Sequence, residues 1–174
     1  PAPALWWWHR KGRDPVFRAR SDEGLLKRKS IGQLVARLET ARLARTLGTL
    51  LRNGVPLLTA LGIGRNVMGN LVLSADVEAA ANDVKGGVGL STALGKGKRF
   101  PRLALQMIQV GEESGALDTM LLKTADTFEA ETSAALDRML AALVPVITMV
   151  LAGVVAIVIL AVLMPIYDLT NAIG

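Results

Sequence analysis

The last third of the sequence contains a long run without charge. Residues 139–167 hold no Asp, Glu, Lys or Arg; Arg138 precedes this run and Asp168 is the only charged residue after it. A helix needs about 20 apolar residues to cross the roughly 30 Å hydrocarbon core of a bilayer. The alternative is a buried helix of a soluble protein, but such helices are usually shorter. The run therefore predicts a transmembrane helix over residues 139–167, followed by a short tail, residues 168–174.

The positive charge of the chain is concentrated near its beginning. Residues 10–29 carry eight Lys or Arg and three Asp or Glu, which accounts for the whole formal net charge of +5. A charge this local argues against a nucleic-acid-binding surface. Residues 6–8 are three tryptophans, which favour the membrane interface, while Lys and Arg favour its cytoplasmic side. We interpret residues 1–29 as a juxtamembrane segment after an earlier membrane helix; an exposed, unstructured terminus is the alternative.

The intervening residues, 30–138, show helical spacing of apolar side chains and no alternation typical of strands. Gly54 fits a left-handed helix end and Pro56 the first turn of the next helix. A third helix is expected from about Asn70 to Lys85, and Ser114 as the N-cap of a long helix that enters the membrane. The predicted fold is all-α: an antiparallel six-helix bundle that continues into a C-terminal transmembrane helix.

The sequence offers no set of residues for catalysis. It has no cysteine and one histidine, His9, which excludes a thiol nucleophile and a zinc site within this chain. The stretch from Gly89 to Lys96 looks like a phosphate-binding loop, but five residues separate Gly89 from Gly95 where that motif has four, and Gly97 stands where it needs Ser or Thr. We predict no enzymatic activity, no cofactor and no metal site.

Four acidic residues of the long C-terminal helix fall on one face. They are Asp118, Asp126, Glu129 and Asp137. Such a face is often only solvated. It is also a candidate docking surface, together with Glu112, for basic residues of a partner or of a second copy. A third interpretation pairs Glu112 and Glu129 with bases such as Arg99 or Arg102 inside the domain. We predict partner binding by these five acids.

In the apolar run, a row of small or slim residues includes Thr148, Ala152 and Ala156. Small side chains let a second membrane helix approach closely. We therefore expect this row to pack against another membrane helix.

Several short motifs together resemble the type II secretion system F and type IV pilus assembly family of inner-membrane platform proteins. The residues that carry the resemblance are Gly54, Val55, Pro56, Leu57, Gly89, Leu90, Ser91, Ala93, Leu94, Phe100, Pro101, Met107, Ile108, Gly111, Glu112, Glu113, Ser114, Gly115, Leu117 and Glu129. The turn at residues 111–115, before a long helix that enters the membrane, is its most specific part. The resemblance covers residues 34–174.

This resemblance implies a scaffold at the base of a secretion machine. Members have two related cytoplasmic six-helix domains and three membrane helices, of which this chain resembles the second domain and the last membrane helix. The implied partners are a secretion ATPase, other inner-membrane platform proteins, a pseudopilin or pilin, membrane lipid and further copies of the same protein. The implied location is the bacterial inner membrane, with a cytoplasmic domain and a periplasmic C-terminus. A type IV pilus platform and a membrane-tethered adaptor or signalling domain are the alternative functions.

Overall fold

The computed structural model of the chain describes residues 29–174, with side chains from Ile31 onward. The predicted juxtamembrane segment, apart from Lys29, lies outside the described residues. The chain divides into two units, one ending at Thr132 and the other formed by Ser133–Gly174. We call residues 29–132 the helical domain and residues 133–174 the apolar segment, and we describe each by itself.

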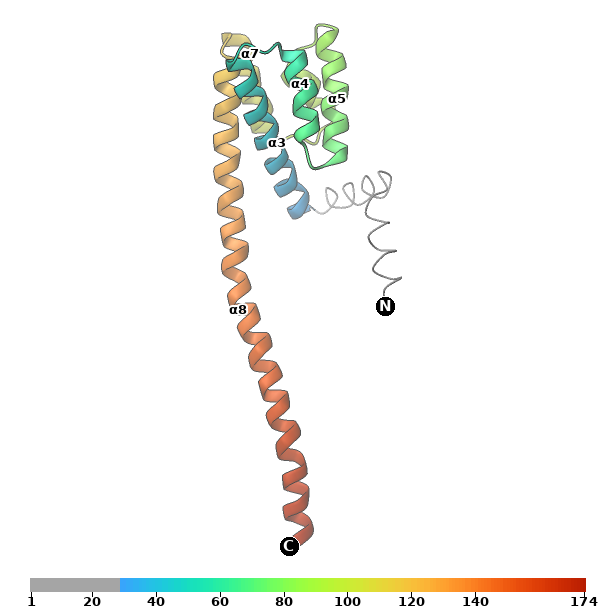
Figure 1. The fold of residues 1–174 in the computed structure, drawn as a ribbon, viewed down its shortest axis with the longest axis vertical. Helices are drawn as coiled ribbons and strands as arrows, with labels where there is room; N and C mark the ends of the chain where they lie inside the picture. Colours follow the sequence, from blue (N-terminus) through green and yellow to red (C-terminus); the bar gives the residue numbers. More distant parts are fainter. Residues whose placement is uncertain (1–28) are drawn as a thin grey trace. The chain divides into compact units, whose positions relative to one another are not determined.

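Every regular element in residues 29–174 is a helix, which confirms the predicted all-α class. In chain order these are α3 (Lys29–Arg52), α4 (Leu57–Val67), α5 (Leu71–Lys85), α6 (Leu90–Gly95), α7 (Arg102–Ser114) and α8 (Leu117–Ile173) (Figure 1). The connections are only two to six residues long. Connections this short favour antiparallel packing of consecutive helices.

The core of the helical domain is a set of aliphatic side chains contributed by all of its helices. Consecutive helices pack against each other from α3 to α7. The largest fully buried side chains are Leu47, Leu61, Leu73, Val77, Leu90, Leu94, Leu121 and Thr124, with Phe128 at 2% exposure. Burial of one large apolar side chain stabilises a fold by about 1.5–3 kcal/mol. This core therefore fixes the helices on which the charged residues stand.

Glycines with positive φ follow α3, α5 and α7, and Gly54 and Gly115, after α3 and α7, show how such a glycine ends a helix. Gly54 has φ 84°, and Val55 N donates to Leu50 O at 2.9 Å while Gly54 N donates to Leu51 O at 3.0 Å. Gly115 has φ 70° and follows α7. A side chain is disfavoured at such φ values, so glycine allows the chain to reverse direction directly after each helix. At both turns the sequence thus determines where the helix stops.

The predicted capping role of Ser114 was wrong. Ser114 is the last residue of α7, and its Oγ donates to Gly111 O at 3.5 Å. Gly115 and Ala116 separate it from α8, and Ala116 O accepts the hydrogen bond from Met120 N at 3.0 Å. Because the chain reverses at Gly115, the hydroxyl of Ser114 stays with the helix behind it.

The apolar segment is the C-terminal part of α8 and runs to Ile173. Its large apolar side chains are exposed; Met149, for example, is 77% exposed. Within residues 29–174, α8 is the helix with the length and apolar composition to cross a membrane. Its helical conformation extends beyond Tyr167, where we predicted the span to end, and includes Pro145 and Pro165.

Candidate functional site

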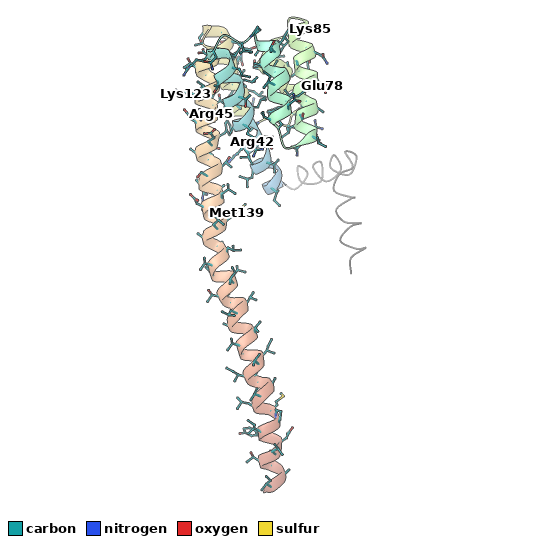
Figure 2. All side chains as sticks on the ribbon, in the orientation of Figure 1. Arg42, Arg45, Glu78, Lys85, Lys123 and Met139 are labelled. Carbon is teal, nitrogen blue, oxygen red and sulfur yellow. The ribbon has the colours of Figure 1, made fainter. Side chains whose placement is uncertain are left out.

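Most of the acidic face of α8 lies against α3. The guanidinium of Arg45 binds two of its carboxylates: Nη2 lies 2.5 Å from Asp126 Oδ1 and 2.7 Å from Glu129 Oε2, while Nε donates to Glu129 Oε1 at 3.1 Å. This is the fork geometry in which arginine binds carboxylates most strongly. The hydrogen bonds that Arg45 donates, first to Glu129 and then to Asp126, raise the pKa of Arg45 above its usual value. Figure 2 labels Arg45 on α3 where it faces α8.

Two further ion pairs join the same helices on either side of Arg45. Arg52 Nε lies 3.5 Å from Asp118 Oδ2, and Arg37 Nη1 lies 3.4 Å from Glu131 Oε2. As the residue numbers increase along α3, the numbers of their partners on α8 decrease, as expected for antiparallel helices. Gly48 lies between these contacts, where a Cβ atom would stand 3.0 Å from Leu122 N. We call this set the α3–α8 ion pairs.

The structure separates the five predicted partner-binding acids into three groups. Asp118, Asp126 and Glu129 take part in the α3–α8 ion pairs. Asp137 lies in the apolar segment and has no ion pair among the described residues. Glu112 lies on α7 and is bound within the helical domain. Partner binding by these residues stays a prediction.

The carboxylate of Glu112 holds the start of α6. It accepts hydrogen bonds from Leu90 N, from Ser91 N at 3.1 Å and from Ser91 Oγ at 2.6 Å. These amides begin α6 and have no partner within that helix, so a carboxylate there satisfies their hydrogen bonds. Its negative charge is also stabilised by the positive end of the helix dipole. A Cβ atom at Gly89 would lie 3.3 Å from Glu112 Oε1. Gly89 thereby leaves the room that this contact needs.

The other residues of the 111–115 turn also have structural contacts. A Cβ atom at Gly111 would lie 2.8 Å from Met120 Cβ and 3.0 Å from Leu117 Cα, so α7 and α8 approach each other closely here. Glu113 accepts a hydrogen bond from Gln109 Nε2 at 2.9 Å. The motif therefore joins α6, α7 and α8 to one another.

Two basic residues of the α6–α7 connection pair with α5, not with the acidic face of α8. Lys96 Nζ lies 2.9 Å from Asp83 Oδ2, and Arg99 Nη1 lies 2.8 Å from Asp76 Oδ1. The interpretation that Glu112 and Glu129 are bound inside the domain agrees with these contacts, but the bases it named were wrong. Glu129 pairs with Arg45 of α3, and Glu112 accepts hydrogen bonds at the start of α6. The stretch that looks like a phosphate loop is α6 itself, with Lys96 bound to Asp83.

A groove of about 360 Å³ lies between the start of α3, the start of α7 and α8. Three arginines, Arg37, Arg99 and Arg102, line it, with Glu131 as the acid among its lining residues. Phe100 and Leu103 add apolar surface. We call this feature the arginine groove. Pro101 also lines it and precedes the first residue of α7.

Glu39 is a buried acid that the sequence analysis did not single out. It is 4% exposed, accepts a hydrogen bond from Gly69 N at 2.9 Å and lies 3.4 Å from Arg42 Nη1. It ties α3 to the connection between α4 and α5. Its position four residues before Leu43, on the apolar face of α3, was the signal that could have found it. Among residues 29–174, no three His, Cys, Asp or Glu side chains lie close enough together to hold a metal ion.

In the apolar segment, Thr148 Oγ1 donates to Val144 O at 2.9 Å, so its hydroxyl is satisfied within the helix. Ala152 and Ala156 are exposed and follow Thr148 at intervals of four residues. Packing of this row against another membrane helix stays a prediction.

An all-helical domain whose last helix includes an apolar segment long enough to cross a bilayer defines a membrane-associated helical protein. Residues 43–165 match the family described as "Type II secretion system (T2SS), protein F". The chain belongs to this family.

The chain is similar to curated proteins of two kinds of machine. It is 73% identical to the type II secretion system protein F of Xanthomonas campestris pv. campestris, over 97% of this chain and 42% of that protein. It is 38% identical to the type II secretion system protein F of Pseudomonas aeruginosa, over 93% of this chain and 40% of that protein. It is also 38% identical to the type IV pilus assembly protein PilC of the same organism, over 93% and 43%. The chain thus spans about two fifths of the length of these relatives.

Proposed function

We propose that this chain is part of a non-enzymatic inner-membrane platform subunit of a type II secretion system. In this proposal it links the cytoplasmic ATPase and other platform proteins to assembly of the pseudopilus. The observation that carries the proposal is the composition of α8, which contributes Leu121 and Phe128 to the domain core and also contains the apolar run. A helix shared in this way suits a scaffold, because it anchors a folded domain at the membrane.

Sequence identity to the relatives favours a type II secretion system over a type IV pilus machine. The relative at 73% identity bears the name of a type II secretion protein. The type IV pilus relative from Pseudomonas aeruginosa is 38% identical, a value shared by the secretion relative from that organism. A type IV pilus platform is therefore the second candidate function.

The proposed orientation places the helical domain in the cytoplasm and the C-terminus in the periplasm. Lys and Arg concentrate on the cytoplasmic side of membrane helices. Eight bases lie within residues 10–29, whereas Asp168 is the one charged residue after Tyr167.

The proposed partners are the secretion ATPase, other platform proteins, a pseudopilin and further copies of the subunit. We propose that the outer edges of the acidic face still meet basic partner residues, because the side chain of Asp126 is 70% exposed although it pairs with Arg45.

Co-purification tests this proposal. A tagged full-length protein that contains this chain should retain the secretion ATPase and platform proteins after solubilisation in mild detergent. A matched tagged membrane protein from the same strain serves as the control for nonspecific capture. Recovery of a pilus ATPase in place of the secretion ATPase would favour the pilus platform, and recovery of neither would oppose both.

A further inference from the structure

Residues 31–132 of the helical domain hold eleven bases and ten acids, and four of the bases make no ion pair within the described residues. Eight acids take part in ion pairs: Glu39, Asp76, Glu78, Asp83, Asp118, Asp126, Glu129 and Glu131. The two other acids of residues 31–132, Glu112 and Glu113, accept hydrogen bonds. Several exposed bases, in contrast, have no ion pair in the described part of the chain; they are Lys85, Lys98, Arg102 and Lys123. These four bases are free to bind an anion.

One of these four bases, Arg102, lines the arginine groove. Arg37 there is paired with Glu131, and Arg99 donates to both oxygens of Asp76 at 2.8 and 2.9 Å. Arg102 is exposed and makes neither an ion pair nor a hydrogen bond within residues 29–174. Three arginines thus line one groove whose lining includes a single acid, and within the described residues Arg102 is the one of the three without an ion pair. The planar guanidinium matches the oxygens of phosphate better than an ammonium does.

The groove also offers apolar surface beside these charges. Leu103, at the start of α7, is 47% exposed, and the buried Phe100 also belongs to the lining. A small inorganic anion would leave this surface uncovered. A ligand that joins a phosphate to carbon chains would contact both parts of the groove.

Along the sequence, the groove is close to the uncharged run. Glu131 lines the groove, and the uncharged run begins eight residues later at Met139. Even a fully extended chain of eight residues spans at most about 28 Å. Anionic lipid surfaces attract Lys and Arg placed close to them. Lipid headgroups lie at the ends of a membrane-spanning segment. They are therefore a phosphate source within the reach of this groove.

We propose that the arginine groove binds the phosphodiester headgroup of an anionic phospholipid. Arg102 is its main ligand, because its guanidinium has no other partner within the described residues, and Arg37 and Arg99 add positive charge. Leu103, which is 47% exposed, contacts the carbon atoms next to the phosphate. This site would hold the helical domain to the lipid surface, whichever machine the subunit serves.

Calorimetric titration tests the site directly. The 174-residue chain in a neutral detergent is titrated with short-chain phosphatidylglycerol below its micelle concentration. Arg102→Gln should weaken binding about five- to tenfold, because it removes a charge-assisted hydrogen bond at a partly screened site. Arg102→Lys should lose less, since it keeps the charge. Lys85→Gln is the matched control: Lys85 is also exposed and without an ion pair, and Figure 2 shows it at the end of α5.

Several results would overturn the proposal. One is unchanged affinity in Arg102→Gln, and another is an equal loss in Lys85→Gln, which would indicate nonspecific attraction. Equally tight binding of short-chain phosphatidylcholine would remove the selectivity for an anion. Displacement of the lipid by inorganic phosphate at similar concentration would assign the groove to free phosphate, and displacement by hexaglutamate would assign it to an acidic peptide. Circular dichroism of each variant checks that the domain stays folded.

Discussion

At the scale of single residues, Gly111 is held where a side chain has no room. A Cβ atom there would lie 2.8 Å from Met120 Cβ on α8. We predict that Gly111→Ala destabilises the helical domain by about 1–3 kcal/mol, because the two helices must move apart. Gly62 is the control: it lies inside α4 and has open space around it. Gly62→Ala should stabilise by up to about 1 kcal/mol, and urea unfolding followed by circular dichroism measures both.

The neighbouring glutamates give a second prediction at this scale. Glu112→Gln should cost about 1–3 kcal/mol, since the carboxylate accepts three hydrogen bonds at the start of α6. Glu113→Gln should change stability by less than about 0.5 kcal/mol, because Glu113 is exposed. Thermal unfolding of the two variants compares them. Equal effects would contradict the capping role assigned to Glu112.

At the scale of helices, exchanging the charges of Arg45, Asp126 and Glu129 tests whether the α3–α8 ion pairs stabilise the domain. Arg45→Glu should destabilise the domain by about 1–2 kcal/mol at low salt, because two exposed pairs are lost and three acids face one another. The triple variant with Asp126→Lys and Glu129→Lys should recover most of this loss. Both differences should shrink as ionic strength rises, since exposed charges are screened. A triple variant as unstable as Arg45→Glu would show that these pairs do not join the helices.

The same triple variant tests whether the acidic face docks to a partner. It restores the pairing within the domain but reverses the sign of the charge that the face presents. If the face docks, secretion should fall and its salt dependence should change although the melting temperature is normal. Normal secretion by the triple variant would limit the role of these residues to the fold.

In the apolar segment, Ala152→Leu should impair assembly while membrane insertion continues, because leucine is at least as favourable in lipid as alanine. Ala161→Leu is the matched control, since nine residues place it about 180° away around the helix. Crosslinking to neighbouring membrane helices distinguishes the two variants. Equal crosslinking of both would show that the row containing Ala152 meets only lipid.

Local signals predicted the helices well, and contacts between distant residues escaped prediction. The helix expected from about Asn70 to Lys85 is α5, which starts where Asn70 Oδ1 accepts from Val72 N and Leu73 N. The partners of Glu112 are 21 and 22 residues away, and those of Arg45 are 81 and 84 residues away. The pattern of residues within one helix does not identify the helix that will pack against it. The acidic face was visible in the sequence, but its pairing with α3 was not.

At the scale of the whole molecule, the orientation of the chain is a prediction that one reporter pair decides. A periplasm-active reporter fused after Gly174 should be active, and a cytoplasm-only fluorescent reporter at the same site should stay dark. The reason is the concentration of bases before the apolar run. The opposite pattern would place the helical domain outside the cytoplasm.

The central claim is that this chain serves as part of a secretion platform, and replacement in a living secretion system measures it most directly. The corresponding part of the Xanthomonas campestris protein F, 73% identical, is replaced by this chain, and export of the proteins that this system secretes is quantified in the medium. We predict that the hybrid restores export to near the native level, whereas a hybrid carrying Gly111→Ala restores less. A hybrid that accumulates in the membrane at normal amounts and exports nothing would contradict the account.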